Sequence, residues 1–173
     1  MQIRAARLDD AAAIDAVLAR ACPALMASSY NADLLAAALP AMVKAQPALL
    51  QSGTYYVAED AGRLIGCGGW SFEEPGSRRL EDGLAHLRHF ATDPAMVRRG
   101  VGRAIVARCL AMATARGVTC FEAFASLNAE PFYQSLGLER LDRVDLPMAP
   151  GIRLPAIRMR GSVPAMEHRL KPA

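Results

Sequence analysis

Two glycines one residue apart, with arginines on both sides, are the residues whose types and spacing best suit a chemical role. They are Gly100 and Gly102, preceded by Arg98 and Arg99 and followed by Arg103, where an amphipathic helix is expected to begin. The first backbone N–H groups of a helix have no partner within it, and glycine leaves them uncovered. The helix dipole and the arginine charges add attraction for an anion. The segment therefore predicts a site for phosphate or pyrophosphate.

The spacing of these glycines excludes two common phosphate-binding motifs. A dinucleotide fingerprint needs a third glycine at position 105, where the chain has Ile105. The Walker type needs Gly-Lys-Ser or Gly-Lys-Thr, and neither occurs. A helix start whose glycines only permit close packing remains the structural alternative.

The glycine segment resembles motif A of the GNAT superfamily of acyl-CoA-dependent N-acetyltransferases. That pattern is Gln or Arg, two residues, Gly, one residue, then Gly or Ala. Gly100 and Gly102 fit it, whereas Val97 stands at the Gln or Arg position. The departure affects one side-chain contact, while the family's main grip on pyrophosphate is through backbone amides, which a valine retains.

Two further segments are similar to the same family. Residues 1–14 look like its opening strand and capped helix, and residues 128–138 contain the Asn, Phe-Tyr and Leu-Gly elements of its late helix. The resemblance covers residues 1–161. It implies a single domain of mixed α/β (α+β) class, with a mostly antiparallel central sheet, helices on both faces and a splayed cofactor cleft.

The resemblance also implies how acetyl-CoA binds, in the gap between the strands at residues 85–92 and 119–126. The end of the first strand would pair its backbone with the pantetheine amides, as an added strand does. The residues expected to contact acetyl-CoA are Phe90, Ala91, Thr92, Arg98, Arg99, Gly100, Val101, Gly102, Arg103, Asn128 and Tyr133.

The implied activity is direct transfer of an acetyl group from acetyl-CoA to a primary amine in a ternary complex. An amine with a pKa of roughly 10 must first lose a proton to a general base. The carbonyl oxygen needs a backbone donor, for which an N–H near Thr92 is the best candidate. Tyr133 matches the family's proton source for the leaving thiolate.

His86 is the candidate base, because it falls where some family members have a catalytic glutamate. A histidine suits proton removal near neutral pH, although a structural strand histidine is the alternative. Glu73, Glu74 and Glu122 are weaker candidates, and a water chain without a single base stays open.

Strand and helix periodicity predict how the candidate residues are oriented. The strand alternation puts His86, Arg88 and Phe90 on one face and His89 on the other. In the late helix, Phe132 and Leu136 should form a core pair, which leaves Tyr133 pointing elsewhere. Asn128 should cap that helix.

Composition bounds the class of protein. A chain of 173 residues that is 53% hydrophobic can form one domain with a sizeable core. The mild net charge of +3, spread along the chain, argues against a nucleic-acid partner. The four cysteines form no Cys-x-x-Cys pair, which predicts reduced thiols and no metal site. No apolar run approaches ~18 residues, so we expect a cytoplasmic protein without a membrane partner.

The expected acceptor is a small-molecule or peptide amine, selected by the segments that roof the cleft, residues 23–31 and 73–82. The family resemblance also allows a homodimer through the last hairpin or the tail. Two functions of other classes stay open, a non-catalytic CoA-binding sensor and a protein-interaction module on the same fold.

Local patterns also predict the order of elements. Strands are expected at residues 2–6, 54–59, 64–72, 85–92, 119–126, 138–146 and 153–160. Helices are expected at residues 10–21, ended by Pro23, at 31–39, ended by Pro40, at 99–116 and at 129–136, with a looser helix between Pro40 and residue 50. Residues 162–173 should be a mobile tail or a partner contact.

Overall fold

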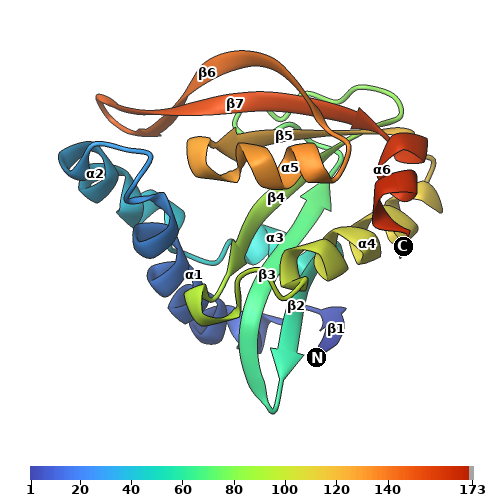
Figure 1. The fold of residues 1–173 in the computed structure, drawn as a ribbon, viewed down its shortest axis with the longest axis horizontal. Coiled ribbons are helices and arrows are strands. Elements are labelled where there is room, and N and C mark those ends of the chain that lie inside the picture. The colour runs from blue at the N-terminus through green and yellow to red at the C-terminus, as the bar shows by residue number, and fades with distance from the viewer. Residues whose placement is uncertain (172–173) are drawn as a thin grey trace.

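Seven strands form a single sheet in the computed structural model, which describes residues 1–171. The strands are β1 (Gln2–Ala5), β2 (Tyr55–Asp60), β3 (Arg63–Ser71), β4 (Leu84–Thr92), β5 (Cys120–Ser126), β6 (Glu139–Ala149) and β7 (Ile152–Ser162). Their order is β1-β2-β3-β4-β5-β7-β6, and within the described residues only β4 and β5 pair in parallel (Figure 1). The predicted mixed, mostly antiparallel sheet is confirmed.

Helices cover both faces of this sheet. They are α1 (Ala11–Met26), α2 (Ala32–Met42), α3 (Pro47–Gln51), α4 (Val101–Thr114), α5 (Glu130–Ser135) and α6 (Val163–Leu170). Figure 1 shows α1 and α2 on one side of the sheet and α4 and α6 on the other. Helix α1 buries Ile14 and Leu18 in one apolar cluster, and α4 buries Ile105 and Cys109 in a second. Among the helices of residues 1–171, none has both the length and the apolar character that crossing a membrane requires.

The parallel strands β4 and β5 part after three paired positions. The last of these pairs joins His86 to Glu122. Strand β4 stays paired with β3 as far as Thr92, and β5 stays paired with β7 as far as Ser126. Residues 87–92 therefore have no strand neighbour on the β5 side, and the predicted splay of these two strands is confirmed.

Two prolines lie inside helices that they were expected to end. Pro23 lies three residues before the end of α1, and Pro40 two residues before the end of α2. The expected stops are therefore wrong. Met26 and Ala38 are buried in a third apolar cluster, with relative exposures of 4% and 0%. Tertiary packing of these helix ends outweighs the local cost of a proline in the last turn.

The chain after β7 is a docked helix, so the expectation of a mobile tail is wrong for residues 162–171. Val163 and Met166 of α6 are buried in the same apolar cluster as α4. Ser162 caps the helix by accepting a hydrogen bond from the backbone N–H of Ala165. A serine cap with proline in the first turn is a helix-start signal that is present in the sequence. Residues 172–173 lie outside the described residues.

Candidate active site

The glycine segment forms an exposed turn between β4 and α4. Gly100 is the N-cap of α4 and has a φ of 78°, and Arg98 has a φ of 66°. A Cβ added at Gly100 would have nothing within 4 Å. The first helical hydrogen bond runs from Ala104 N to Gly100 O at 2.9 Å, so the N–H groups of residues 101–103 have no partner within the helix. The turn is therefore open, as an anion site requires.

Asp93 anchors this turn, although the sequence does not single it out. Its side chain is buried, and Oδ1 accepts a hydrogen bond from Ala95 N at 3.0 Å. Oδ2 accepts hydrogen bonds from Arg20 at 3.1 Å and from Arg63 at 2.6 Å. The hydrogen bond from Ala95 and the two guanidinium groups lower the pKa of Asp93 despite its burial. The carboxylate thereby ties the turn to α1 and β3.

The absence of a side chain at Gly102 is needed for helix packing as well as for the predicted ligand contact. A Cβ at Gly102 would lie 3.0 Å from the ring of Phe132, so the glycine lets α5 approach α4 closely. The Arg103 guanidinium donates a hydrogen bond to the carbonyl of Arg169 in α6. Val101 is buried and can offer a ligand only its backbone. The packing alternative therefore applies to Gly102 and not to Gly100.

Asn128 does not cap α5, so that expectation is wrong. It lies within a 3-10 helix, Leu127–Ala129, and the N-cap of α5 is Ala129. Among the described residues, no group donates a hydrogen bond to its buried Oδ1. An unpartnered buried amide oxygen is costly, and an N–H group of a ligand would satisfy it. Asn128 thus fits the predicted cofactor contact for a reason that the sequence does not reveal.

Tyr133 takes the core side of α5, contrary to the expected Phe132–Leu136 pair. Tyr133 and Leu136 are buried in the α4 cluster, whereas Phe132 is half-buried. The missing side chain at Gly102 leaves the space that Phe132 fills. Burial raises the pKa of the Tyr133 phenol well above its ordinary value, so the hydroxyl is protonated at neutral pH.

A β-bulge in β4 alters which of its side chains share a face. Cys67 pairs with Ala91, and Gly69 pairs with Arg88, so a single β3 residue lies opposite two residues of β4. His89, within the bulge, has a φ of 54°. An inserted residue of this kind reverses the alternation of the residues that follow.

The expected faces are therefore wrong for Phe90 and His89. Phe90 packs against the α4 cluster. His89 lies toward α1 and α2, where its Nε2 is 2.8 Å from the carbonyl oxygen of Met42. His86 and Arg88 precede the bulge and remain on one face.

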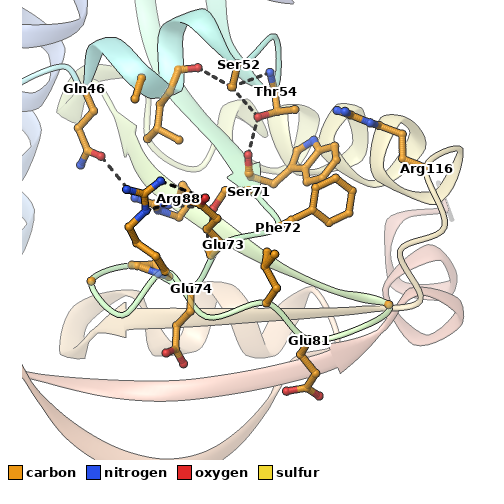
Figure 2. Close-up of a pocket in the computed structure, with 18 of the residues that line it drawn as sticks. Gln46, Ser52, Thr54, Ser71, Phe72, Glu73, Glu74, Glu81, Arg88 and Arg116 are labelled. Carbon is orange, nitrogen blue, oxygen red and sulfur yellow. Dashed lines mark hydrogen bonds and ion pairs between the residues drawn. The ribbon is translucent and has the colours of Figure 1, made fainter.

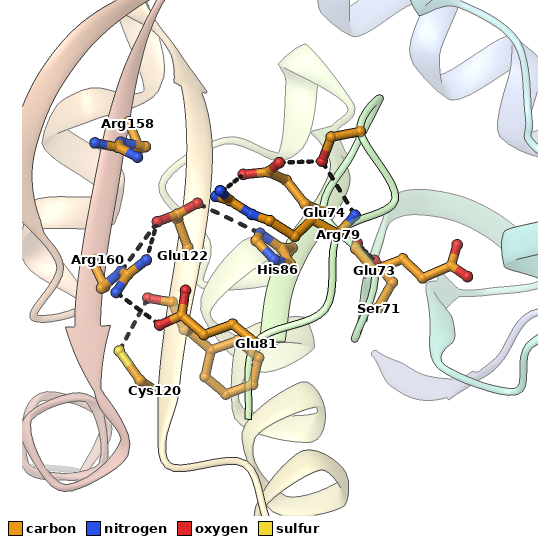
Figure 3. A network of polar contacts seen from close by, with 12 residues as sticks. Ser71, Glu73, Glu74, Arg79, Glu81, His86, Cys120, Glu122, Arg158 and Arg160 are labelled. Atoms are coloured by element: carbon orange, nitrogen blue, oxygen red, sulfur yellow. Dashed lines mark hydrogen bonds and ion pairs between the residues drawn. The ribbon is translucent and has the colours of Figure 1, made fainter. Parts of the chain in front are cut away.

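His86 and Glu122 meet at the point where β4 and β5 part (Figure 3). Their exposed fractions are 2% and 1%, and His86 Nδ1 lies 3.7 Å from Glu122 Oε1. Glu122 Oε2 accepts hydrogen bonds from Arg160 Nε at 3.1 Å and Nη2 at 2.9 Å. Burial lowers the pKa of His86 more strongly than the nearby carboxylates raise it. The imidazole is therefore neutral at pH 7 and able to accept a proton.

The other candidate bases lie in the loop between β3 and β4 and are paired with arginines. Glu73 is 3.2 Å from Arg78, and Glu74 is 3.2 Å from Arg79. Both pairs are partly or fully exposed. This loop, residues 72–83, contains the segment expected to roof the cleft, and it lines a cavity of about 870 Å³.

No residue of the glycine turn lines that cavity, whose wall is shown in Figure 2. Its wall is formed by α3, the loop between β3 and β4, and the ends of β3 and α4. Arg88 and Ser71, the β3 partner of His86, belong to it. None of the predicted cofactor residues lines it. The open turn suited to an anion follows the end of β4, whereas the cavity suited to a second ligand lies near the start of that strand.

The model of a protein family described as "Acetyltransferase (GNAT) domain" matches residues 51–140. The match spans β2 to the start of β6 and includes the glycine turn, the splayed strands and α5. No curated protein matches the chain closely enough to count as a relative.

Solved structures of acetyltransferases share the fold. A GCN5-related N-acetyltransferase from Rhodopseudomonas palustris is 23% identical, with a TM-score of 0.73 over 93% of this chain and 94% of that one. PaiA N-acetyltransferase from Thermoplasma acidophilum, solved in complex with coenzyme A, is 14% identical, with a TM-score of 0.70 over 93% and 98%. Rv2747 from Mycobacterium tuberculosis, solved with CoA and NLQ, is 20% identical, with a TM-score of 0.62 over 94% and 99%. Identities this low show a common fold.

Proposed function

The chain belongs to the GNAT acetyltransferase family, and we propose that it transfers an acetyl group from acetyl-CoA to a primary amine by direct attack in a ternary complex. The observation that carries the proposal is the exposed turn at Gly100, whose helix-start N–H groups face outward beside the splayed strands β4 and β5. Those two features supply the two contacts that a long pyrophosphate-bearing thioester needs, an anion site and a free strand edge.

In this proposal the chain binds coenzyme A mainly through its backbone. The N–H groups of residues 101–103 bind the pyrophosphate, and the exposed Arg98 and Arg99 add positive charge. The free edge of β4 covers residues 87–92. The backbone groups of Phe90, Ala91 and Thr92 on this edge pair with the amides of the pantetheine arm. Asn128 Oδ1 accepts a hydrogen bond from the ligand. The coenzyme contributes an activated acetyl group.

The proton transfers are assigned to His86 and Tyr133. His86 is neutral because burial lowers its pKa, so it can remove a proton from the ammonium of the acceptor, directly or through water. Glu122 lies 3.7 Å from Nδ1 and stabilises the imidazolium that results. Tyr133 stays protonated and donates to the leaving sulfur. A backbone N–H on the free edge of β4 stabilises the oxygen that becomes negative.

Two measurements test the proposal. Calorimetry of the full chain with CoA measures cofactor binding, and release of free thiol from acetyl-CoA over a panel of primary amines measures transfer. Amine-dependent thiol release, with the N-acetylated product identified by mass spectrometry, supports the proposal. CoA binding without amine-dependent release would indicate a sensor, and absence of CoA binding would indicate a protein-interaction module.

A further inference from the structure

Arg88 is a half-buried cation without an anionic partner. Its guanidinium lies in the wall of the cavity, where Nη1 donates to Ser71 Oγ at 2.8 Å and Nη2 donates to Gln46 Oε1 at 3.4 Å (Figure 2). Both acceptors are neutral. Within residues 1–171, no carboxylate oxygen lies within 4.0 Å of its nitrogens. Burial lowers the pKa of this guanidinium, and the charge of Glu73, whose carboxylate is paired with Arg78, offsets this effect only in part.

Three of the four carboxylates that line this cavity form ion pairs with other arginines. The pairs are Arg78–Glu73 at 3.2 Å, Arg79–Glu74 at 3.2 Å and Arg160–Glu81 at 3.3 Å. Asp82, at the rim, is exposed to water. Most arginines without a carboxylate partner in the described chain are also exposed, so water solvates their charge. Arg88 is partly shielded from water and has no carboxylate in direct contact, and a partly desolvated charge of this kind favours binding of an anion.

Arg88 also lies close to the proposed base, although His86 itself is buried and does not line the cavity. It follows His86 by two residues on the same face of β4, a separation of about 6.6 Å along a strand. The bulge begins directly after Arg88, so the strand up to that point is regular. The cavity volume of about 870 Å³ is sufficient for a small molecule.

We propose that Arg88 binds a carboxylate of the acceptor, so that the substrate is an amine that carries its own carboxylate, as an amino acid does. This inference rests on the proposed acetyl transfer. The planar guanidinium has N–H groups in a fork that matches the two oxygens of a carboxylate. Binding there supplies the missing counter-charge and directs the amine toward His86.

The experiment compares matched acceptors that differ only in the carboxylate. Each set contains an amino acid, its amide and the corresponding decarboxylated amine. The variants are Arg88→Met, Arg88→Lys and Arg116→Met. Arg116 is a suitable comparison because it also lines the cavity without a carboxylate partner, but it is exposed and lies over the Trp70 and Phe72 rings at 5.4 Å from each. Circular dichroism and thermal melting establish that each variant folds.

For the wild-type protein, kcat/KM should be higher for the amino acid than for its amide or the decarboxylated amine. Arg88→Met should reduce this value for the amino acid by roughly 10- to 100-fold, the usual effect of losing hydrogen bonds to a charged group. Its kcat/KM for the decarboxylated amine should change by less than about 3-fold, and Arg88→Lys should be intermediate because it keeps the charge and loses the fork. Arg116→Met should keep the preference.

A binding measurement separates this inference from the proposed function. Calorimetry of the CoA-loaded protein with the same amino acids and amides detects the carboxylate site even if no acetyl group is transferred. Amino-acid binding that depends on Arg88, without any turnover, would support the carboxylate site while acetyl transfer fails. Amides that bind or react as well as amino acids, or a preference abolished by Arg116→Met and kept by Arg88→Met, would overturn the assignment.

Discussion

Replacing Gly100 by alanine tests whether the turn before α4 binds coenzyme A. Gly100 has a φ of 78°, which an L-residue adopts at a cost of about 1–2 kcal/mol. Because a Cβ there meets nothing within 4 Å, no steric term adds to this cost. For a chain of this size, the loss corresponds to a fall in Tm of roughly 2–8 °C. The new methyl group projects into the open space that the pyrophosphate would occupy.

Gly117, just beyond the other end of α4, provides the matched control. Its φ is 85°, and a Cβ added there also has nothing within 4 Å. Gly117→Ala should therefore lower Tm by a similar amount. The 14-residue helix α4 separates the two glycines by about 21 Å, so a methyl group at Gly117 cannot reach the turn.

The two variants should differ in their affinity for CoA, measured by calorimetry at a temperature where both are folded. Gly100→Ala should bind CoA roughly 10- to 100-fold more weakly, as expected when backbone hydrogen bonds to a charged group are lost. Gly117→Ala should bind it like the wild-type protein. If both variants retain wild-type affinity while both lose stability, the pyrophosphate does not bind at this turn, and the reasoning from its open N–H groups is wrong.

Three other substitutions probe the remaining parts of the site. His86→Gln should reduce kcat by about 10²- to 10⁴-fold. In the wild-type protein, kcat/KM should rise with pH through a pKa below 6.5, because burial lowers the pKa of His86 and its neutral form is the base. A pH profile without this rise would exclude His86 as the base. Tyr133→Phe should lower kcat much more than CoA affinity, whereas equal losses in both would indicate packing alone. Asp93→Asn should destabilise the fold by about 1–3 kcal/mol in urea unfolding at pH 7, because Arg20 and Arg63 lose their anion. Since the pKa of Asp93 is lowered in the folded state, its contribution to stability is present above pH 3.8 and is lost as the pH falls. The free energies of unfolding of the variant and the wild type should therefore become equal in acid.

The sequence alone was sufficient for the order of the seven strands and of helices α1, α2, α4 and α5, and for the open turn, but not for α6. Gly100, a helix-start glycine between arginines, and the strand that precedes it are defined by signals within a few residues of each other. The alternating and helical apolar patterns likewise act over one element at a time, so the predicted strands and the helix after Gly100 agree with the structure to within a few residues. The ends of α1 and α2 differ from the prediction because the local signals at Pro23 and Pro40 do not include the tertiary packing that stabilises those turns.

Tertiary structure decided which side chains meet. Glu122 faces His86 only because β5 pairs with β4 for three positions and then diverges, a register that no local pattern encodes. The bulge at His89 depends on how β3 pairs with β4, and it moved Phe90 to the opposite face from Arg88. These contacts join segments tens of residues apart, so they depend on how the whole sheet packs rather than on the propensity of any one segment. For the same reason, the sequence contains Arg88 but does not show that it lacks an anionic partner.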